Sequence, residues 1–270
     1  MSGKTMFYYQ TFTEGLNVNN CITDIHLSSI HFGIESDGQP YIHLNNLYPE
    51  HESFKSVWTD LSIAYEKKIS ISLMIGGAGG GWETFLSRYS ECYSLLTGLL
   101  KRHPIITGID LDIEESVNLT QIISFIKDIK SEYPHFEISM SPLATSLQTD
   151  TSGMGGFIYK DIYKYDIVDY YCGQFYGTFD VNAFDLCIRN GYKANQILMG
   201  SINGTGQSSV INELKTKYPN IGGVCAWEYG SMSQQDALNW ASIMHNILKN
   251  KIKHNVITRT FHKINEYMFK

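Results

Sequence analysis

Apolar and polar positions alternate in blocks along most of the chain. Each block is a short apolar or β-branched stretch, then a loop marked by Gly or Pro, then a stretch with helical periodicity. The pattern predicts eight strands, at residues 6–11, 28–34, 69–75, 108–114, 137–141, 167–175, 196–201 and 222–227. It predicts seven helices between them, at residues 53–67, 82–100, 119–133, 155–163, 182–190, 208–217 and 234–250.

Two of these helices carry local start signals. Asn118 precedes one of them and can cap it, with Gln121 reaching back to the cap. The helix then presents an apolar stripe of Ile122, Phe125, Ile126 and Ile129. Ser233 provides the same kind of start signal for the last helix.

The strand pattern indicates the fold class. Several strands, such as residues 69–75, are apolar on both faces, which is typical of parallel strands covered by helices. Strands that alternate with helices favour an α/β protein with a single-domain (β/α)8 TIM barrel over residues 1–250. An open, doubly wound sheet is the alternative. The tail at residues 251–270 is basic, with apolar positions interleaved, and we expect it to pack on the barrel. Binding to a partner helix or subunit is the other interpretation.

Composition narrows the possible partners. The net charge is −6 and the pI is near 5.8, which argues against a nucleic-acid partner. Five scattered cysteines form no metal-binding or disulfide pattern, so we expect free thiols, no metal and no cofactor. No apolar stretch reaches 18 residues, and no secretory leader precedes the first strand. We therefore expect a monomer without a membrane partner, cytoplasmic as given or secreted if a leader has been removed.

The most informative segment is the predicted strand at residues 108–114. Strand side chains alternate between faces, so Asp110, Asp112 and Glu114 point to one side, and Ile109, Leu111 and Ile113 to the other. Neighbouring carboxylates oppose each other's ionisation, so at least one of the three should have a raised pKa. Because this arrangement is poor for stability, it indicates a catalytic role, and barrel enzymes place their chemistry at the carboxyl ends of strands.

Other interpretations of this region remain open. The strand could be a solvated acidic edge, or the spacing Asp110-x-Asp112 could bind magnesium or manganese. The glycine-rich segment at residues 76–81 follows a strand, but it lacks the residues of a phosphate-binding loop. We interpret it as a flexible loop over the mouth of an active site.

Four motifs in order resemble those of the family-18 glycoside hydrolases, the chitinases and their relatives. The sequence Thr-Gly-Ile-Asp-Leu-Asp-Ile-Glu that ends at Glu114 resembles the family signature D-G-x-D-x-D-x-E. Leu-Met-Ile-Gly-Gly, ending at Gly77, resembles the S-x-G-G strand one step earlier. Gln174-Phe-Tyr176 resembles a strand of the plant class III chitinases, and Gly-Gly-Val-Cys-Ala-Trp227 resembles the last strand.

The resemblance implies a role for each matching residue. Glu114 would be the general acid and then the base, while the 2-acetamido oxygen of the substrate attacks the anomeric carbon. Asp112 would hold the acetamido N–H, and Asp110 would share a proton with Asp112, so that the pair titrates as a coupled unit. Tyr176 would bind the acetamido carbonyl. The sugar site around these groups would be lined by Gln174, by Trp227 as its floor, by Tyr8 and Phe32, and by the glycines Gly76 and Gly77.

Two residues depart from the family pattern. Thr107 replaces the first Asp of the signature, on the acidic face but far from the scissile bond, and Met74 replaces a Ser that could bond to Asp110. Both changes should weaken the control of the pKa of Asp110. The resemblance also implies non-proline cis peptides at residues 31–32 and 227–228.

The resemblance favours an enzyme over a binding protein, because all the residues assigned to catalysis are present. It implies a retaining endo-glycosidase that cuts β-1,4 bonds in a polysaccharide or oligosaccharide containing N-acetylglucosamine, such as chitin. The alternatives are an endo-β-N-acetylglucosaminidase that acts on N-glycans and a catalytically silent chitinase-like lectin. Few residues separate Ser201 from Gly222, so we expect no inserted α+β domain and therefore an open, shallow cleft.

Overall fold

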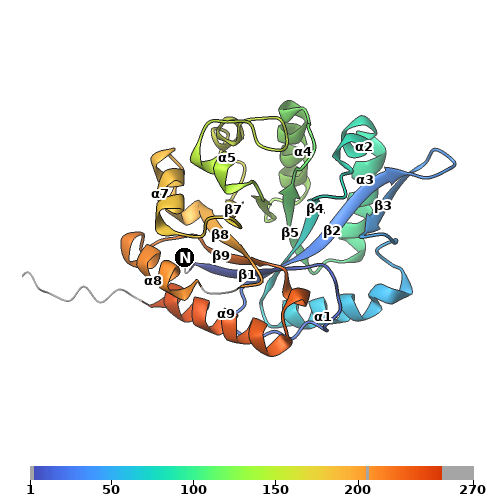
Figure 1. Cartoon of the computed structure of the whole chain (residues 1–270). Coiled ribbons are helices and arrows are strands. Elements are labelled where there is room, and N and C mark those ends of the chain that lie inside the picture. The colour runs from blue at the N-terminus through green and yellow to red at the C-terminus, as the bar shows by residue number, and fades with distance from the viewer. Residues whose placement is uncertain (1–2, 205–206, 251–270) are drawn as a thin grey trace, which may run out of the picture.

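The first barrel strand pairs with both the second and the last, so the sheet closes on itself (Figure 1). The computed structural model describes residues 3–204 and 207–250. Its parallel pairings run in the order β1-β9-β8-β7-β6-β5-β4-β2, and β1 pairs with β2 to complete the barrel. These strands are β1 Lys4–Tyr9, β2 Asp24–Ile34, β4 Ser70–Gly76, β5 Ile106–Asp112, β6 Glu137–Met140, β7 Tyr170–Gln174, β8 Ile197–Ile202 and β9 Gly223–Trp227. The predicted (β/α)8 barrel is confirmed, and the open sheet is excluded.

Helices surround the barrel on its outer side (Figure 1). The α-helices are α1 Lys55–Glu66, α2 Trp82–Ser87, α3 Tyr89–Arg102, α4 Leu119–Glu132, α5 Ala144–Gln148, α6 Tyr159–Tyr163, α7 Val181–Arg189, α8 Ser208–Lys217 and α9 Gln234–Lys249. Short 3-10 helices are η1 Glu52–Phe54, η2 Ala194–Gln196 and η3 Tyr229–Ser231. Asn118 and Ser233 cap α4 and α9 as predicted, through bonds from the backbone N–H groups of Thr120 and Asp236. In the described part of the chain, Gln121 makes no side-chain hydrogen bond back to the cap.

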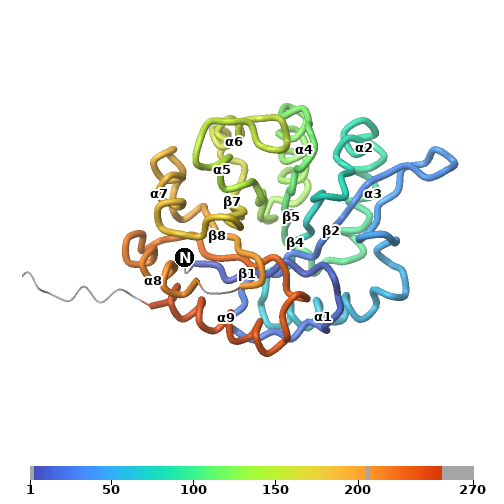
Figure 2. The backbone as a smooth tube through the Cα atoms, viewed as in Figure 1, coloured from blue at the N-terminus to red at the C-terminus, as the bar shows by residue number. Residues whose placement is uncertain are grey.

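The sequence pattern missed one hairpin and one short helix, and joined two helices into one. Strand β3, Pro40–Leu44, runs antiparallel to the outer half of β2, and this hairpin extends beyond the barrel (Figure 2). Helix α5 was not predicted, and the helix predicted at residues 155–163 begins only at Tyr159. The helix predicted at residues 82–100 breaks at Arg88 (φ −117°, ψ 42°). Periodicity did not reveal the break because Phe85 and Cys92, one on each side of it, are both buried.

The strands separate two kinds of interior. Between barrel and helices lies a large aliphatic and aromatic core, to which Ile109 and Leu111 of β5 belong. Inside the barrel, a smaller cluster of Met6, Tyr8, Met74, Tyr170, Cys172, Leu198 and Cys225 is mixed with buried polar groups. Asp110 and Asp112 are on this inner side, as strand alternation predicted.

The segment after β8 is short. Between β8 and β9, the described residues form the single helix α8, so no α+β insertion is present there. No helix in residues 3–204 and 207–250 is long and apolar enough to cross a membrane. The basic tail at residues 251–270, with its predicted packing, lies outside the described residues.

Candidate active site

A cavity of about 310 Å³ opens at the carboxyl ends of the barrel strands. Its lining residues come from six strands or the loops that follow them, as expected when parallel strands end at one rim of a barrel. Its lining consists of Gln10, Ser29, His31, Met74, Gly77, Ala78, Gly79, Asp112, Glu114, Gln174, Tyr176 and Trp227. The cavity therefore brings together residues from all four motifs.

Asp112 lies at the floor of this cavity and is only 6% exposed. Burial raises its pKa well above the ordinary value, and the negative charges of Glu114 and Asp110 raise it further. The amide of Gln174 reaches one carboxyl oxygen at 3.4 Å and is held by the carbonyl of Ser141 at 2.8 Å. The predicted raised pKa in the acidic strand thus belongs to Asp112, which retains its proton at a pH where an exposed Asp has lost it.

Asp110 lies one step deeper, is fully buried, and behaves in the opposite way. Ser139 donates a hydrogen bond to its Oδ1 at 2.6 Å, and Ser141 and Tyr8 donate to its Oδ2 at 2.7 and 3.2 Å. Burial alone would raise the pKa of Asp110, but the nearby His26 and the serine hydroxyls outweigh burial and hold the pKa below its ordinary value. Three hydroxyl donors stabilise the ionised form of Asp110, whereas Asp112 above it has a raised pKa.

The remaining matched residues surround Asp112 at the mouth of the cavity. Glu114 follows the end of β5 and is partly exposed, so solvent and ligands can reach it. Tyr176 is 37% exposed on the loop after β7. Trp227 ends β9 and packs against Tyr8, with ring centroids 5.3 Å apart. A carboxyl group, a phenol, an amide and an indole therefore border one small space.

The glycine-rich segment forms one wall of the cavity. Gly77, Ala78 and Gly79 line it, and the ring of His31 contacts the carbonyl of Gly80 at 3.0 Å. The indole N–H of Trp82 and the backbone N–H of Gly77 both donate to the carbonyl of Asp112, at 3.1 and 2.9 Å. The segment is a loop that lines the cavity, and these two bonds attach it to the end of the acidic strand.

Three residues predicted to bind substrate do not line the cavity. Phe32 packs against Phe85 in the outer core, because strand alternation turns its neighbour His31 toward the cavity instead. Tyr8 is 3% exposed and lies beneath the cavity, where its hydroxyl serves Asp110. Gly76 (φ +97°) has no room for a side chain beside Trp82 and the carbonyl of Asp112, so its role is to let backbone and indole approach each other.

The predicted cis peptide between Trp227 and Glu228 is present, and the one predicted at residues 31–32 is wrong. The second cis bond lies instead between Ser28 and Ser29, where the pairing of β2 with β4 shifts its register.

The two departures from the family pattern are accommodated in different ways. Thr107 does not join the carboxylates: its hydroxyl donates to the carbonyl of Ile71 and accepts from the N–H of Ile71, both at 3.2 Å. The cause is a shift in the pairing of β4 with β5, which leaves Thr107 without a partner residue in the ladder. Met74 is buried beside Asp110 and accepts a hydrogen bond from Ser28. The hydroxyls for Asp110 come from β6, the segment after it and Tyr8 of β1, not from position 74.

Sequence reasoning missed several residues of this site. Ser139 and Ser141 alternate along and just beyond β6, and this spacing beside an acidic strand is the signal that could have found them. His26 lies within β2, but the predicted strand began only at residue 28, so its inward direction was not recognised. Gln10 and Ser29 follow or interrupt barrel strands and carry no distinguishing pattern.

One group of described residues could in principle hold a metal ion. His26, Asp110 and Cys172 place ligand atoms within 4.8 Å of one another, all of them buried. Both oxygens of Asp110 already accept hydroxyl donors, which leaves its carboxylate poorly placed as a ligand. We therefore assign no metal to this group.

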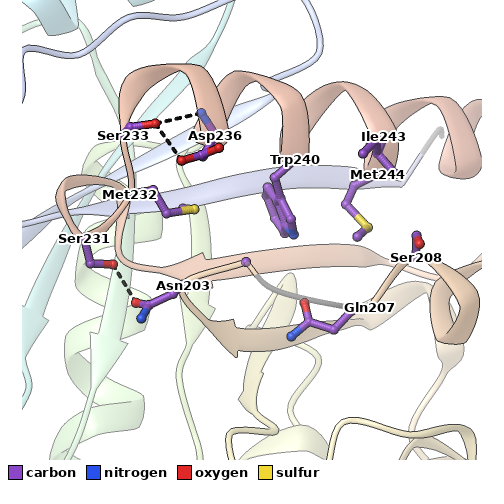
Figure 3. Close-up of a pocket in the computed structure, with 11 residues that line it drawn as sticks. Asn203, Gln207, Ser208, Ser231, Met232, Ser233, Asp236, Trp240, Ile243 and Met244 are labelled. Atoms are coloured by element: carbon purple, nitrogen blue, oxygen red, sulfur yellow. Dashed lines mark hydrogen bonds between the residues drawn. The ribbon is translucent and has the colours of Figure 1, made fainter.

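A second cavity of about 520 Å³ lies outside the barrel, between the loop after β8 and α9 (Figure 3). Trp240, Met232 and Met244 contribute most of its apolar side chains. Its acid, Asp236, is bonded to Ser233 at the start of α9, as the dashed lines in Figure 3 show. This cavity holds no pair of carboxylates among its described lining residues, and we assign no catalysis to it.

Comparisons with solved structures reveal similar folds. A chitinase, ChiC, from Aspergillus fumigatus superposes with a TM-score of 0.76 and 24% sequence identity, over 84% of this chain and 91% of that one. A fungal endo-β-N-acetylglucosaminidase from glycosyl hydrolase family 18 superposes with a TM-score of 0.75 and 23% sequence identity, over 91% of this chain and 98% of that one. A GH18 chitinase from Pseudoalteromonas aurantia superposes with a TM-score of 0.71 and 15% sequence identity, over 91% of this chain and 100% of that one. No protein-family profile and no curated protein sequence matches the chain. The comparisons therefore establish a shared barrel fold.

Proposed function

We propose that this protein is a chitinase-like glycoside hydrolase of the family-18 type, which retains the anomeric configuration and uses the substrate's own acetamido group as nucleophile. The observation that carries the proposal is the placement of Asp112 and Glu114 in one cavity with Gln174, Tyr176 and Trp227. The order of the four motifs and the fold shared with chitinases support it.

In the proposed reaction, Glu114 protonates the leaving oxygen, and it is accessible enough to do so. The acetamido oxygen attacks the anomeric carbon while the C–O bond to the leaving group breaks, which yields an oxazolinium ion. Asp112, from below, orients the acetamido N–H and faces the positive charge that develops on the ring. Glu114 then removes a proton from water, and this water opens the oxazolinium ion to give the retained product.

The acidic strand supports this division of roles. Asp112 is buried and its pKa is raised, whereas the pKa of Asp110 is lowered by the nearby His26 and by the hydrogen bonds from Ser139 and Ser141. Two carboxyl groups whose surroundings push their pKa values apart are typical of acid–base sites. Trp227 offers a flat apolar surface on which a sugar ring can rest, and it is supported from behind by Tyr8.

The substrate we favour is a β-1,4-linked chain of N-acetylglucosamine units, cut internally. Only α8 lies between β8 and β9 among the described residues, so no inserted domain deepens the cleft on that side. A second candidate is the core of an N-glycan, because one of the similar structures is an endo-β-N-acetylglucosaminidase. A chitinase-like lectin would bind the same sugars without cutting them.

The decisive test is release of 4-methylumbelliferone from its chitotriose glycoside by the wild type and by Glu114→Gln. Loss of the acid should lower kcat by about 10²- to 10⁴-fold, while saccharide binding persists. The matched control is Glu83→Gln, an exposed acid on α2 outside the cavity, which should retain full activity. Saccharide binding without release by the wild type would instead identify a lectin. Products from chitohexaose and from a high-mannose glycopeptide then separate the two substrates.

A further inference from the structure

His26 lies directly beneath the acidic strand, inside the barrel. It belongs to β2, is fully buried, and places Nδ1 3.6 Å from Oδ2 of Asp110. On its other side, Nε2 lies 3.1 Å from the hydroxyl of Tyr170. The ring of Tyr8 meets it edge to face, with centroids 5.2 Å apart. Contacts from three other strands therefore fix the position of this imidazole.

The electrostatics of the barrel interior require a positive partner for Asp110. A buried carboxylate without an opposite charge is costly, and hydroxyl donors compensate only part of that cost. Among the described residues, His26 is the only basic side chain within ion-pair distance of Asp110. Lys4, at the other end of the barrel, is already paired with Asp24 and Glu137. The remaining titratable groups facing His26 are Tyr8, Tyr170 and Cys172, and none of these can supply a positive charge.

We propose that His26 is a positioning residue for the reaction: as an imidazolium it holds Asp110 as a carboxylate, and the charge of Asp110 in turn keeps a proton on Asp112. This inference rests on the proposed function for its catalytic consequence. His26 touches neither the cavity nor the substrate, so it acts only through Asp110. It supplies the tuning of Asp110 that the departures at Thr107 and Met74 were expected to weaken.

The first test compares His26→Gln with the wild type on the chitotriose glycoside. Glutamine can still donate a hydrogen bond but carries no charge, so kcat should fall at least about tenfold while KM changes little. Without the cation, Asp110 remains protonated to higher pH, so the acidic limb of the kcat–pH profile should move to higher pH. The matched control is His245→Gln, the same change at a buried histidine on α9, which should leave the profile in place.

A double-mutant cycle distinguishes tuning from a general packing defect. In an Asp110→Asn background there is no carboxylate left to hold, so His26→Gln should move the pH profile no further. Thermal melting and circular dichroism of each variant report whether it is folded. If His26→Gln lowers kcat but leaves the acidic limb unmoved, or if its shift persists in the Asp110→Asn background, the proposal is wrong.

A measurement on the unaltered protein covers the case in which His26→Gln does not fold. ¹⁵N-histidine NMR of the wild type should show the buried imidazole of His26 protonated on both nitrogens near neutral pH, and Asp110→Asn should abolish that signal. Absence of such an imidazolium overturns the proposal. This readout needs no substrate, so it decides the ion pair even if the wild type hydrolyses nothing, in which case the proposed function alone fails.

Discussion

Replacing Ser139 by alanine tests how Asp110 is stabilised. The Ser139 hydroxyl donates to Oδ1 of Asp110 at 2.6 Å, and both residues are buried. Ser141 and Tyr8 bond to the other oxygen, so Ser139→Ala leaves Oδ1 without a donor among the described residues. A hydrogen bond to a charged group contributes about 1.5–3 kcal/mol. For a chain of this size, that loss corresponds to a decrease in Tm of roughly 3 to 12 °C.

The pH dependence of this loss is part of the prediction. The pKa of Asp110 is lowered in the folded protein, so the residue contributes stability above its unfolded pKa of about 3.9 and loses it as the pH falls through the folded value. Ser139→Ala removes one cause of the lowering. The difference in the free energy of unfolding between wild type and variant should therefore be largest near neutral pH and should shrink in acid.

Urea unfolding followed by circular dichroism, at neutral pH and well below pH about 3.9, measures the loss in the free energy of unfolding and its pH dependence, and thermal melting measures the change in Tm. Ser201→Ala is the matched control, because Ser201 is equally buried on β8 and its hydroxyl has no partner among the described residues. Ser201→Ala should leave the free energy of unfolding nearly unchanged. Equal losses for the two variants, or a loss at Ser139 that does not depend on pH, would refute an ionised Asp110 held by this serine.

Two further changes test the walls of the cavity. Trp82→Phe removes the indole N–H that donates to the carbonyl of Asp112, so it should lower the free energy of unfolding by about 0.5–1.5 kcal/mol. Because the glycine-rich wall then loses this attachment, kcat should fall more than KM rises. An unchanged kcat would show that the wall is held elsewhere. Trp227→Ala removes the proposed floor of the sugar site and should lower kcat/KM on the chitotriose glycoside about thirtyfold, equivalent to about 2 kcal/mol. The control is Trp58→Ala, because Trp58 is stacked on His103 away from the cavity. The folded control variant should keep the kcat/KM of the wild type.

Much of the architecture could be predicted because it depends on local pattern. Apolar runs such as residues 69–75 predicted parallel strands, and all eight barrel strands lie where such runs were found, with ends displaced by a few residues. The inward direction of Asp110 and Asp112 followed from the same alternation. Strand β3 was missed because its pairing depends on the extra length of β2, and the break at Arg88 was missed because the buried positions on both sides of it keep helical spacing.

The sequence by itself determined the alternation of strands with helices and the acidic face of β5, because side-chain alternation is a local property of the chain. The resemblance supplied the motif residues at the rim. Closure into a barrel rather than an open sheet depends on the pairing of β1 with β9, which lie at opposite ends of the described chain. Only the tertiary structure decided what surrounds each carboxyl group. Closure of the barrel brings His26 of β2, Tyr8 of β1 and Ser139 of β6 onto Asp110, and these residues are far apart in the chain. The pKa of a buried carboxyl depends on such neighbours. That is why the sequence placed the three acids together, whereas the lowered pKa of Asp110 and the raised pKa of Asp112 required the folded barrel.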